Sequence, residues 1–105
     1  MSTTSTSTLP KVVLKALTEL TGEPRVDVAL LIALRDAVAY RLEQIAEDIR
    51  EYEQKYGLSF KQFQIRGQKG EIPDQFSYEV ESDYMEWEGL MSRKKKLEKI
   101  HQWLA

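Results

Sequence analysis

The chain has 105 residues, a formal net charge of −2, 30% charged residues and no cysteine. This length suffices for one domain with a modest core, and the missing cysteines exclude disulfides and thiolate metal sites, while the charge balance lacks the basic excess of nucleic-acid-binding domains. No apolar run reaches the roughly 20 residues of a membrane-spanning helix and no signal-peptide pattern opens the chain, so we expect a cytoplasmic protein without membrane contact.

The chain opens with a segment that has nothing to bury. Residues 2–8 are all Ser or Thr, so we expect residues 1–8 to be a disordered arm before a single helical domain over residues 9–105. An alternative is an extended arm that pairs with another copy as a strand, because Thr favours strands.

The first predicted helix follows Thr8, which can cap it, with Pro10 in its first turn. Gly22 is placed to end the helix in the left-handed conformation, and Pro24 prevents its continuation. Its broad apolar face consists of Val12, Val13, Leu14, Ala16, Leu17 and Leu20.

The second predicted helix runs from Val28 to Tyr56, with Asp27 as its cap, and spans roughly 45 Å. Apolar residues recur along it at alternating spacings of four and three: Val38, Leu42, Ile45, Ile49, Tyr52 and Tyr56. Its first half is apolar on more sides, so we expect that half to be the more deeply buried, beneath the first helix and a second chain. The residues predicted for self-association are Leu31, Leu34, Val38 and Leu42.

The connector carries a capping box. Ser59 and Gln62 match this motif, which predicts a short helix from Phe60 to about Arg66. Order then breaks at two glycines and a proline, namely Gly67, Gly70 and Pro73.

The last predicted helix begins between Ser77 and Asp83 and runs to about Trp103, with Asp83 and Glu86 as a second capping pair. An alternative is a short extended piece, because Phe76, Tyr78 and Val80 alternate with polar residues. The apolar seam of this helix contains Tyr84, Trp87, Leu90 or Met91, Leu97, Ile100 and Leu104.

These elements predict an all-α fold. A short N-terminal helix precedes an antiparallel hairpin of two long helices, whose short connecting helix allows the chain to return. Because two long helices and a short one rarely enclose a full core alone, we expect a homodimer or higher oligomer with coiled-coil-like packing.

Two clusters have a chemical interpretation. Seven acidic residues lie between Glu71 and Glu88 without a Lys or Arg among them, which suits either a metal site or the N-terminus of a helix. No histidine lies nearby to complete a carboxylate–histidine set, so we expect neither metal nor cofactor. The single histidine, His101, has no nucleophile at a suggestive spacing, so we expect no enzymatic activity.

A basic run lies further along the last helix. Nucleic acid or an acidic partner is one interpretation, and a solvated helix C-terminus is the other. No aromatic residue is interleaved for base stacking. The candidate nucleic-acid contacts are Arg93, Lys95, Lys96 and Lys99.

Gly89 lies inside this predicted helix, where glycine costs roughly 1 kcal/mol relative to alanine. A close helix crossing or a partner backbone would compensate for that cost. Interfaces favour aromatic anchors, so we expect a partner-binding surface; an equal alternative makes Trp87 a core residue of its own chain. The surface consists of Tyr84, Trp87, Glu88 and Leu90.

Two segments carry a family resemblance: residues 55–60 (KYGLSF) with Phe63, and residues 83–90 (DYMEWEGL). Together they resemble small helical antitoxin-like proteins of prokaryotic toxin–antitoxin pairs, over about residues 10–104. Residues 14–42 also resemble the helices of ribbon-helix-helix antitoxins, but Ser, Thr, Leu9 and Pro10 stand where those proteins have a basic strand for the major groove. The resemblance implies an intracellular protein that binds a toxin and has no enzymatic activity.

Our hypothesis from the sequence is a non-enzymatic protein-interaction module, antitoxin-like, that binds and occludes a toxin partner, with acidic residues covering a basic face. The alternatives are a DNA-binding dimeric regulator and a helical oligomerisation scaffold. A small metal-dependent enzyme that uses the acidic cluster is a further hypothesis.

Overall fold

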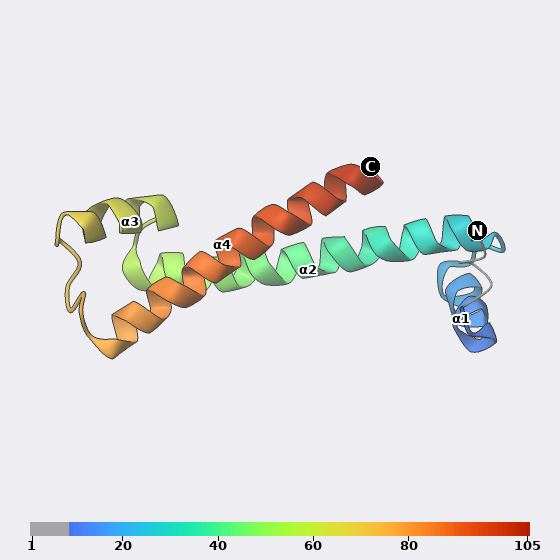
Figure 1. The fold of residues 1–105 in the computed structure, drawn as a ribbon, viewed down its shortest axis with the longest axis horizontal. Coiled ribbons are helices and arrows are strands. Elements are labelled where there is room, and N and C mark those ends of the chain that lie inside the picture. Colours follow the sequence, from blue (N-terminus) through green and yellow to red (C-terminus); the bar gives the residue numbers. More distant parts are fainter. Residues whose placement is uncertain (1–8) are drawn as a thin grey trace, which may run out of the picture.

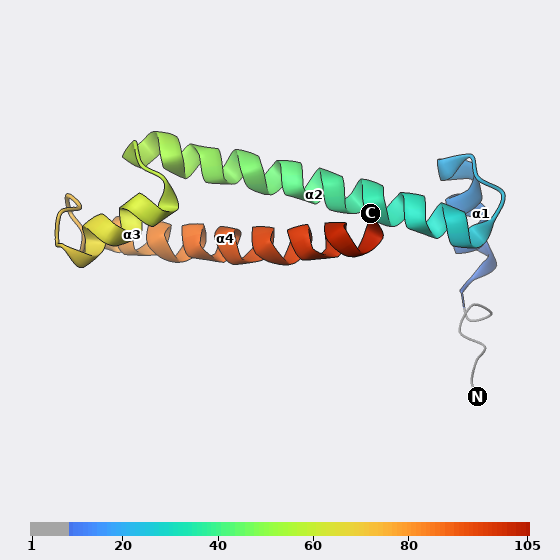
Figure 2. The same cartoon turned by 90° about the horizontal axis from the view of Figure 1, so that it is seen from above.

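Two long helices, α2 (Val26–Tyr56) and α4 (Tyr78–Leu104), run antiparallel in the computed structural model, which describes residues 9–105 (Figure 1, Figure 2). The short helix α3 (Phe60–Gln68) lies at the closed end of this hairpin, and α1 (Lys11–Thr21) crosses the other end of α2. The predicted all-α fold and its element order are confirmed. The predictions for residues 1–8, including the cap at Thr8, lie outside the described residues.

Two glycines end helices as predicted. Gly22 and Gly57 adopt left-handed backbone conformations, with φ of 71° and 66°. The start of α2 corrects the prediction, because Arg25 holds the cap position and Asp27 lies within the first turn, accepting a hydrogen bond from Arg25 at 3.1 Å. Pro10 likewise caps α1 instead of lying in its first turn.

The connector is more helical than predicted. The capping box is confirmed, with Ser59 and Gln62 bonded reciprocally, but α3 continues through Gly67, whose carbonyl accepts from Gln75 Nε2 at 2.7 Å. Helix α4 begins at Tyr78, and Ser77 Oγ accepts from the backbone N–H of Val80. The extended alternative and the second capping pair are therefore wrong.

The core lies at the closed end of the hairpin. Helix α1 contributes no buried residue. Arg35 Nε donates to the carbonyl of Leu104 at 2.6 Å, so α4 ends beside the first third of α2 and does not reach the first turns of α2 (Figure 2). Each half of α2 contributes two buried residues, Ala29 and Val38 in the first and Ile45 and Ile49 in the second, so greater burial of the first half is not seen within one chain. Its burial beneath a second chain stays a prediction. The buried core cluster consists of Ile45, Ile49, Phe60, Phe63, Ile72, Val80, Trp87 and Leu97.

Among residues 9–105, no helix combines the length and the apolar character that crossing a membrane requires.

Candidate functional site

Trp87 lies at the junction of three helices and is 0% exposed. Its ring stacks on Tyr52 of α2, with ring centroids 5.6 Å apart, and meets Phe60 and Phe63 of α3 at 5.3 Å each. The prediction of Trp87 as a partner contact is corrected, because the side chain has no free surface; the alternative of a core tryptophan describes its place.

The other residues of that predicted surface are not equivalent. Tyr84 is partly buried, packs against Phe60 with centroids 5.7 Å apart, and accepts a hydrogen bond from Gln64 at 3.2 Å. Leu90 packs partly against the core, whereas Glu88 is exposed. The four residues thus form no continuous outer surface.

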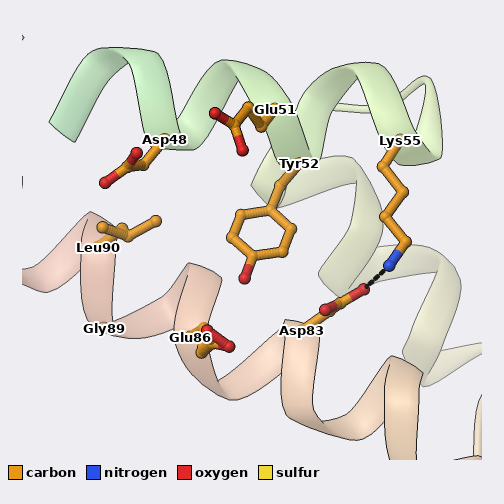
Figure 3. A pocket seen from close by; sticks show the side chains of 8 residues that line it. All are labelled: Asp48, Glu51, Tyr52, Lys55, Asp83, Glu86, Gly89 and Leu90. Carbon is orange, nitrogen blue, oxygen red and sulfur yellow. Dashed lines mark hydrogen bonds and ion pairs between the residues drawn. The ribbon is translucent and has the colours of Figure 1, made fainter. Parts of the chain in front are cut away.

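An ion-pair cluster joins the end of α2 to the start of α4 (Figure 3). Lys55 Nζ donates to Glu79 Oε2 at 2.7 Å and to Asp83 Oδ2 at 2.5 Å, and the Tyr56 hydroxyl donates to the same Asp83 oxygen. Half-exposed pairs of this kind contribute modestly, but they join helices that are far apart in sequence. Asp83 does not cap α4, because Ser77 caps the helix and leaves the Asp83 carboxylate free to bind Lys55 and Tyr56.

The same contacts shift three pKa values. Burial opposes ionisation of Asp83, but hydrogen bonds from Lys55 and Tyr56 outweigh burial and lower the pKa of Asp83. Burial and the hydrogen bond to Asp83 raise the pKa of Tyr56 to about 12. The two carboxylates that Lys55 contacts raise its pKa. At neutral pH Lys55 is therefore a cation, Asp83 a carboxylate and Tyr56 a neutral phenol.

An acidic groove of about 680 Å³ lies between α2 and α4 beside this cluster. Figure 3 shows Tyr52 reaching from α2 toward α4 across it, and burial and the nearby Glu86 raise the pKa of Tyr52. Among the described residues no group of His, Asp and Glu has an arrangement that could hold a metal ion. The charge of the groove suits cationic side chains of a partner. The lining residues are Asp48, Glu51, Tyr52, Lys55, Asp83, Glu86, Gly89 and Leu90.

An apolar groove of about 450 Å³ lies between α3, the connector and α4. Phe76 and Met85, 82% and 71% exposed, stand at this groove, and Gln75 Oε1 is buried without a hydrogen-bond partner among the described residues. No sequence pattern predicted this groove. The one signal for it is the apolar alternation from Phe76 to Val80, for which an extended piece was the alternative to the predicted helix.

We name α1 and residues 26–34 of α2 the open end of the molecule. Helix α1 is strongly amphipathic, yet none of its residues is buried. Leu20 is 79% exposed and Leu34 50% exposed. The hairpin leaves this apolar surface uncovered because α4 stops beside Arg35.

The predicted self-association stripe is divided between two environments. Val38 is buried and Leu42 packs against the core, so the hairpin itself already uses both side chains. Leu31 is partly exposed and Leu34 is exposed. Only this second pair, in the open end, is available for contact with another chain.

The basic run lies along the second half of α4. Arg93, Lys95, Lys96 and Lys99 are exposed, and none of them forms an ion pair with the part of the chain that the structure describes. Lys94 is partly buried on the seam side. The four exposed cations therefore remain available to an acidic partner.

Comparison with known proteins gives one family match. The model of the family described as "Uncharacterized protein MJ0235 family" matches residues 9–102, which include α1, α2, α3 and all but the end of α4. No curated protein and no solved structure matches the chain.

Proposed function

The chain belongs to the MJ0235 family, whose description names no activity, and we propose that it is a non-enzymatic interaction protein that binds a partner protein through its open end. The exposed apolar surface of α1 and the start of α2 is the observation that supports this proposal. A partner helix laid along this surface completes the packing that α4 leaves unfinished.

The energetics favour a bound state for this end. Burying one Leu or Val side chain contributes roughly 1.5–3 kcal/mol, and Val12 and Leu20 of α1 are 72% and 79% exposed. A contiguous apolar surface of this kind marks interaction sites in proteins. A partner that covers these side chains therefore contributes favourable burial at the open end.

If the resemblance to antitoxins described above extends to function, the partner protein is a toxin. The acidic groove beside Asp83 and Glu86 then faces basic residues of the toxin, while the open end supplies the apolar contact. Such a complex weakens as salt concentration rises, because salt screens the charge contribution.

The test is co-purification from native cells with four tagged forms: wild type, Leu20→Glu, Leu34→Glu and a control. The control is Ile65→Glu, an equal charge change on α3, where Ile65 is 43% exposed. We expect a protein that the wild type and the control retain and that both open-end variants lose, confirmed by titration with that purified protein.

Two outcomes contradict the proposal. One is recovery of the same proteins by all four forms. The other is an oligomer of the purified chain that Leu34→Glu dissociates, which would assign the open end to self-association.

A further inference from the structure

We propose that a second copy of this chain docks antiparallel along the outward face of α4, so that the two α4 helices form a symmetric pair. This inference is independent of the open end and of its partner. The face lies opposite the buried side that carries Val80 and Trp87. Starting at Tyr78, its residues recur at alternating spacings of four and three, through Met85, Gly89 and Lys96 to Trp103. This is the repeat of a coiled-coil seam.

The centre of this face consists of small residues. Gly89 and Ser92 are exposed, and a Cβ added to Gly89 meets nothing within 4 Å. Contacts within the chain therefore do not require glycine, although glycine costs about 1 kcal/mol inside a helix. Small residues allow two helix backbones to approach closely, so a second α4 gives Gly89 a role that its own chain does not.

The ends of the same face carry exposed aromatic side chains. Tyr78 is 87% exposed at the start of α4, and Trp103 is 72% exposed at its end. When Gly89 faces Ser92 of the second copy in antiparallel order, Tyr78 lies opposite the second copy's Trp103. The two-fold axis repeats this contact, so both aromatic ends are covered at once.

The second copy's Trp103 comes to lie near the apolar groove described above. The apolar groove of about 450 Å³ lies beside the start of α4, with Phe76, Val80 and Met85 in its wall. The antiparallel arrangement brings the indole of the second copy's Trp103 to this end of the helix.

Charge decides the orientation. The flanks of the outward face are acidic before Gly89 and basic after it. Antiparallel pairing sets Glu86 opposite Arg93 of the second copy and Glu88 opposite Lys95, each pair occurring twice by symmetry. In a parallel pair, by contrast, Lys96 and Lys99, which lie on the face itself, would each lie opposite the same lysine of the second copy. The exposed basic residues of α4 thus form ion pairs with the acidic residues of α4 in the second copy.

The first test measures the dimer dissociation constant by sedimentation equilibrium for the wild type and Gly89→Gln. We expect at least a tenfold weaker dimer, because a long side chain separates the helices, while the unfolding midpoint of the monomer stays equal or rises. The control is Glu43→Gln on the exposed surface of α2, which leaves the dissociation constant unchanged. A monomeric wild type at millimolar concentration, or an unaltered dimer in Gly89→Gln, overturns the proposal.

The second test exchanges charges. Glu86→Arg weakens the dimer, and adding Arg93→Glu in the same chain restores it, because the opposed pair is rebuilt with reversed signs. Failure of the double variant to regain the affinity lost by the single variant contradicts the assigned orientation.

The third test uses the absence of cysteine from the chain. Copies with Ser82→Cys mixed with copies with Lys99→Cys form a mixed disulfide, because these positions face each other in the antiparallel pair. Like copies do not cross-link, since equal positions lie roughly 25 Å apart along the helices. Cross-linking of like copies alone indicates parallel pairing and overturns the proposal.

Failure here is distinguishable from failure of the proposed function. Leu34→Glu in the open end leaves the dimer constant unchanged. Trp103→Ala, which removes an aromatic end of the α4 face and lies outside the acidic groove, weakens the dimer and leaves capture of the open-end partner unchanged. A dimer that Leu34→Glu dissociates uses the open end instead of α4.

Discussion

At the scale of single residues, the two tryptophans of α4 have opposite surroundings. Trp87 is 0% exposed among aromatic rings from α2 and α3, whereas Trp103 is 72% exposed. Spacing places Trp87 on the apolar seam of this helix and leaves Trp103 off it, but it does not say which side chains surround either one. Their environments follow from how α3 and α4 pack, so their mutational effects differ.

We expect Trp87→Ala to lower the free energy of unfolding by about 3–5 kcal/mol, because it opens a cavity where three helices meet. Urea denaturation followed by circular dichroism at low protein concentration measures this effect. The matched control, Trp103→Ala, changes the free energy by less than about 0.5 kcal/mol. Equal losses in both variants would contradict the assigned core.

Asp83 gives a pH-dependent contribution whose sign follows from its lowered pKa. A carboxylate with a folded-state pKa below its ordinary value of 3.8 stabilises the fold above that value. The contribution disappears as pH falls through the lower pKa of the folded chain. Wild type is therefore more stable than Asp83→Asn at pH 7, and the difference narrows below about pH 4.

Thermal melts of both proteins across pH 2–7 check this expectation. Glu81→Gln is the control, since Glu81 is exposed and has no ion-pair partner among the described residues. A constant difference between wild type and Asp83→Asn across that pH range would show that the carboxylate charge plays no part.

At the scale of helices, capping signals predicted the ends of the elements well where the cap is local. The pair Ser59 and Gln62 and the glycines Gly22 and Gly57 act within a few residues, so the sequence contains all that they need. Asp83 and Glu86 have the spacing of a cap, but Ser77 caps α4 instead, so Asp83 lies in the second turn and its carboxylate binds Lys55. The spacing of a capping pair does not say which of two candidate sites begins the helix.

The capping box of α3 makes a quantitative prediction. Ser59→Ala removes the acceptor for the backbone N–H of Gln62 and lowers the free energy of unfolding by about 1 kcal/mol. Because Phe60 and Phe63 of α3 are part of the core, loss of this hydrogen bond destabilises the whole hairpin. Urea denaturation compares this variant with Gln54→Ala, an exposed change within α2 that we expect to be nearly neutral.

At the scale of the whole molecule, stability is concentrated at one end. The core cluster lies around α3, and the open end has no buried residue except Ala29. Hydrogen exchange followed by mass spectrometry should therefore show the strongest protection in residues 45–63 and 80–97 and the weakest in residues 11–34. Uniform protection along the chain would contradict this gradient.

Proteins bound at different places change this pattern differently. A partner bound at the open end slows exchange in residues 11–34. A second copy bound along α4 adds protection between Tyr78 and Trp103 and leaves the open end fast. The same measurement on the purified chain at two concentrations separates the two proposals.

The sequence by itself determined the all-α fold, the order of the helices and the ends set by local caps, because apolar periodicity and capping act over a few residues. Only the tertiary structure decided that Trp87 and Val38 are internal, that Asp83 binds Lys55, and that the open end and the outward face of α4 remain uncovered. Periodicity assigns a residue to a face of its helix. The length of α4 and the place of α3 decide which faces find a partner within the chain.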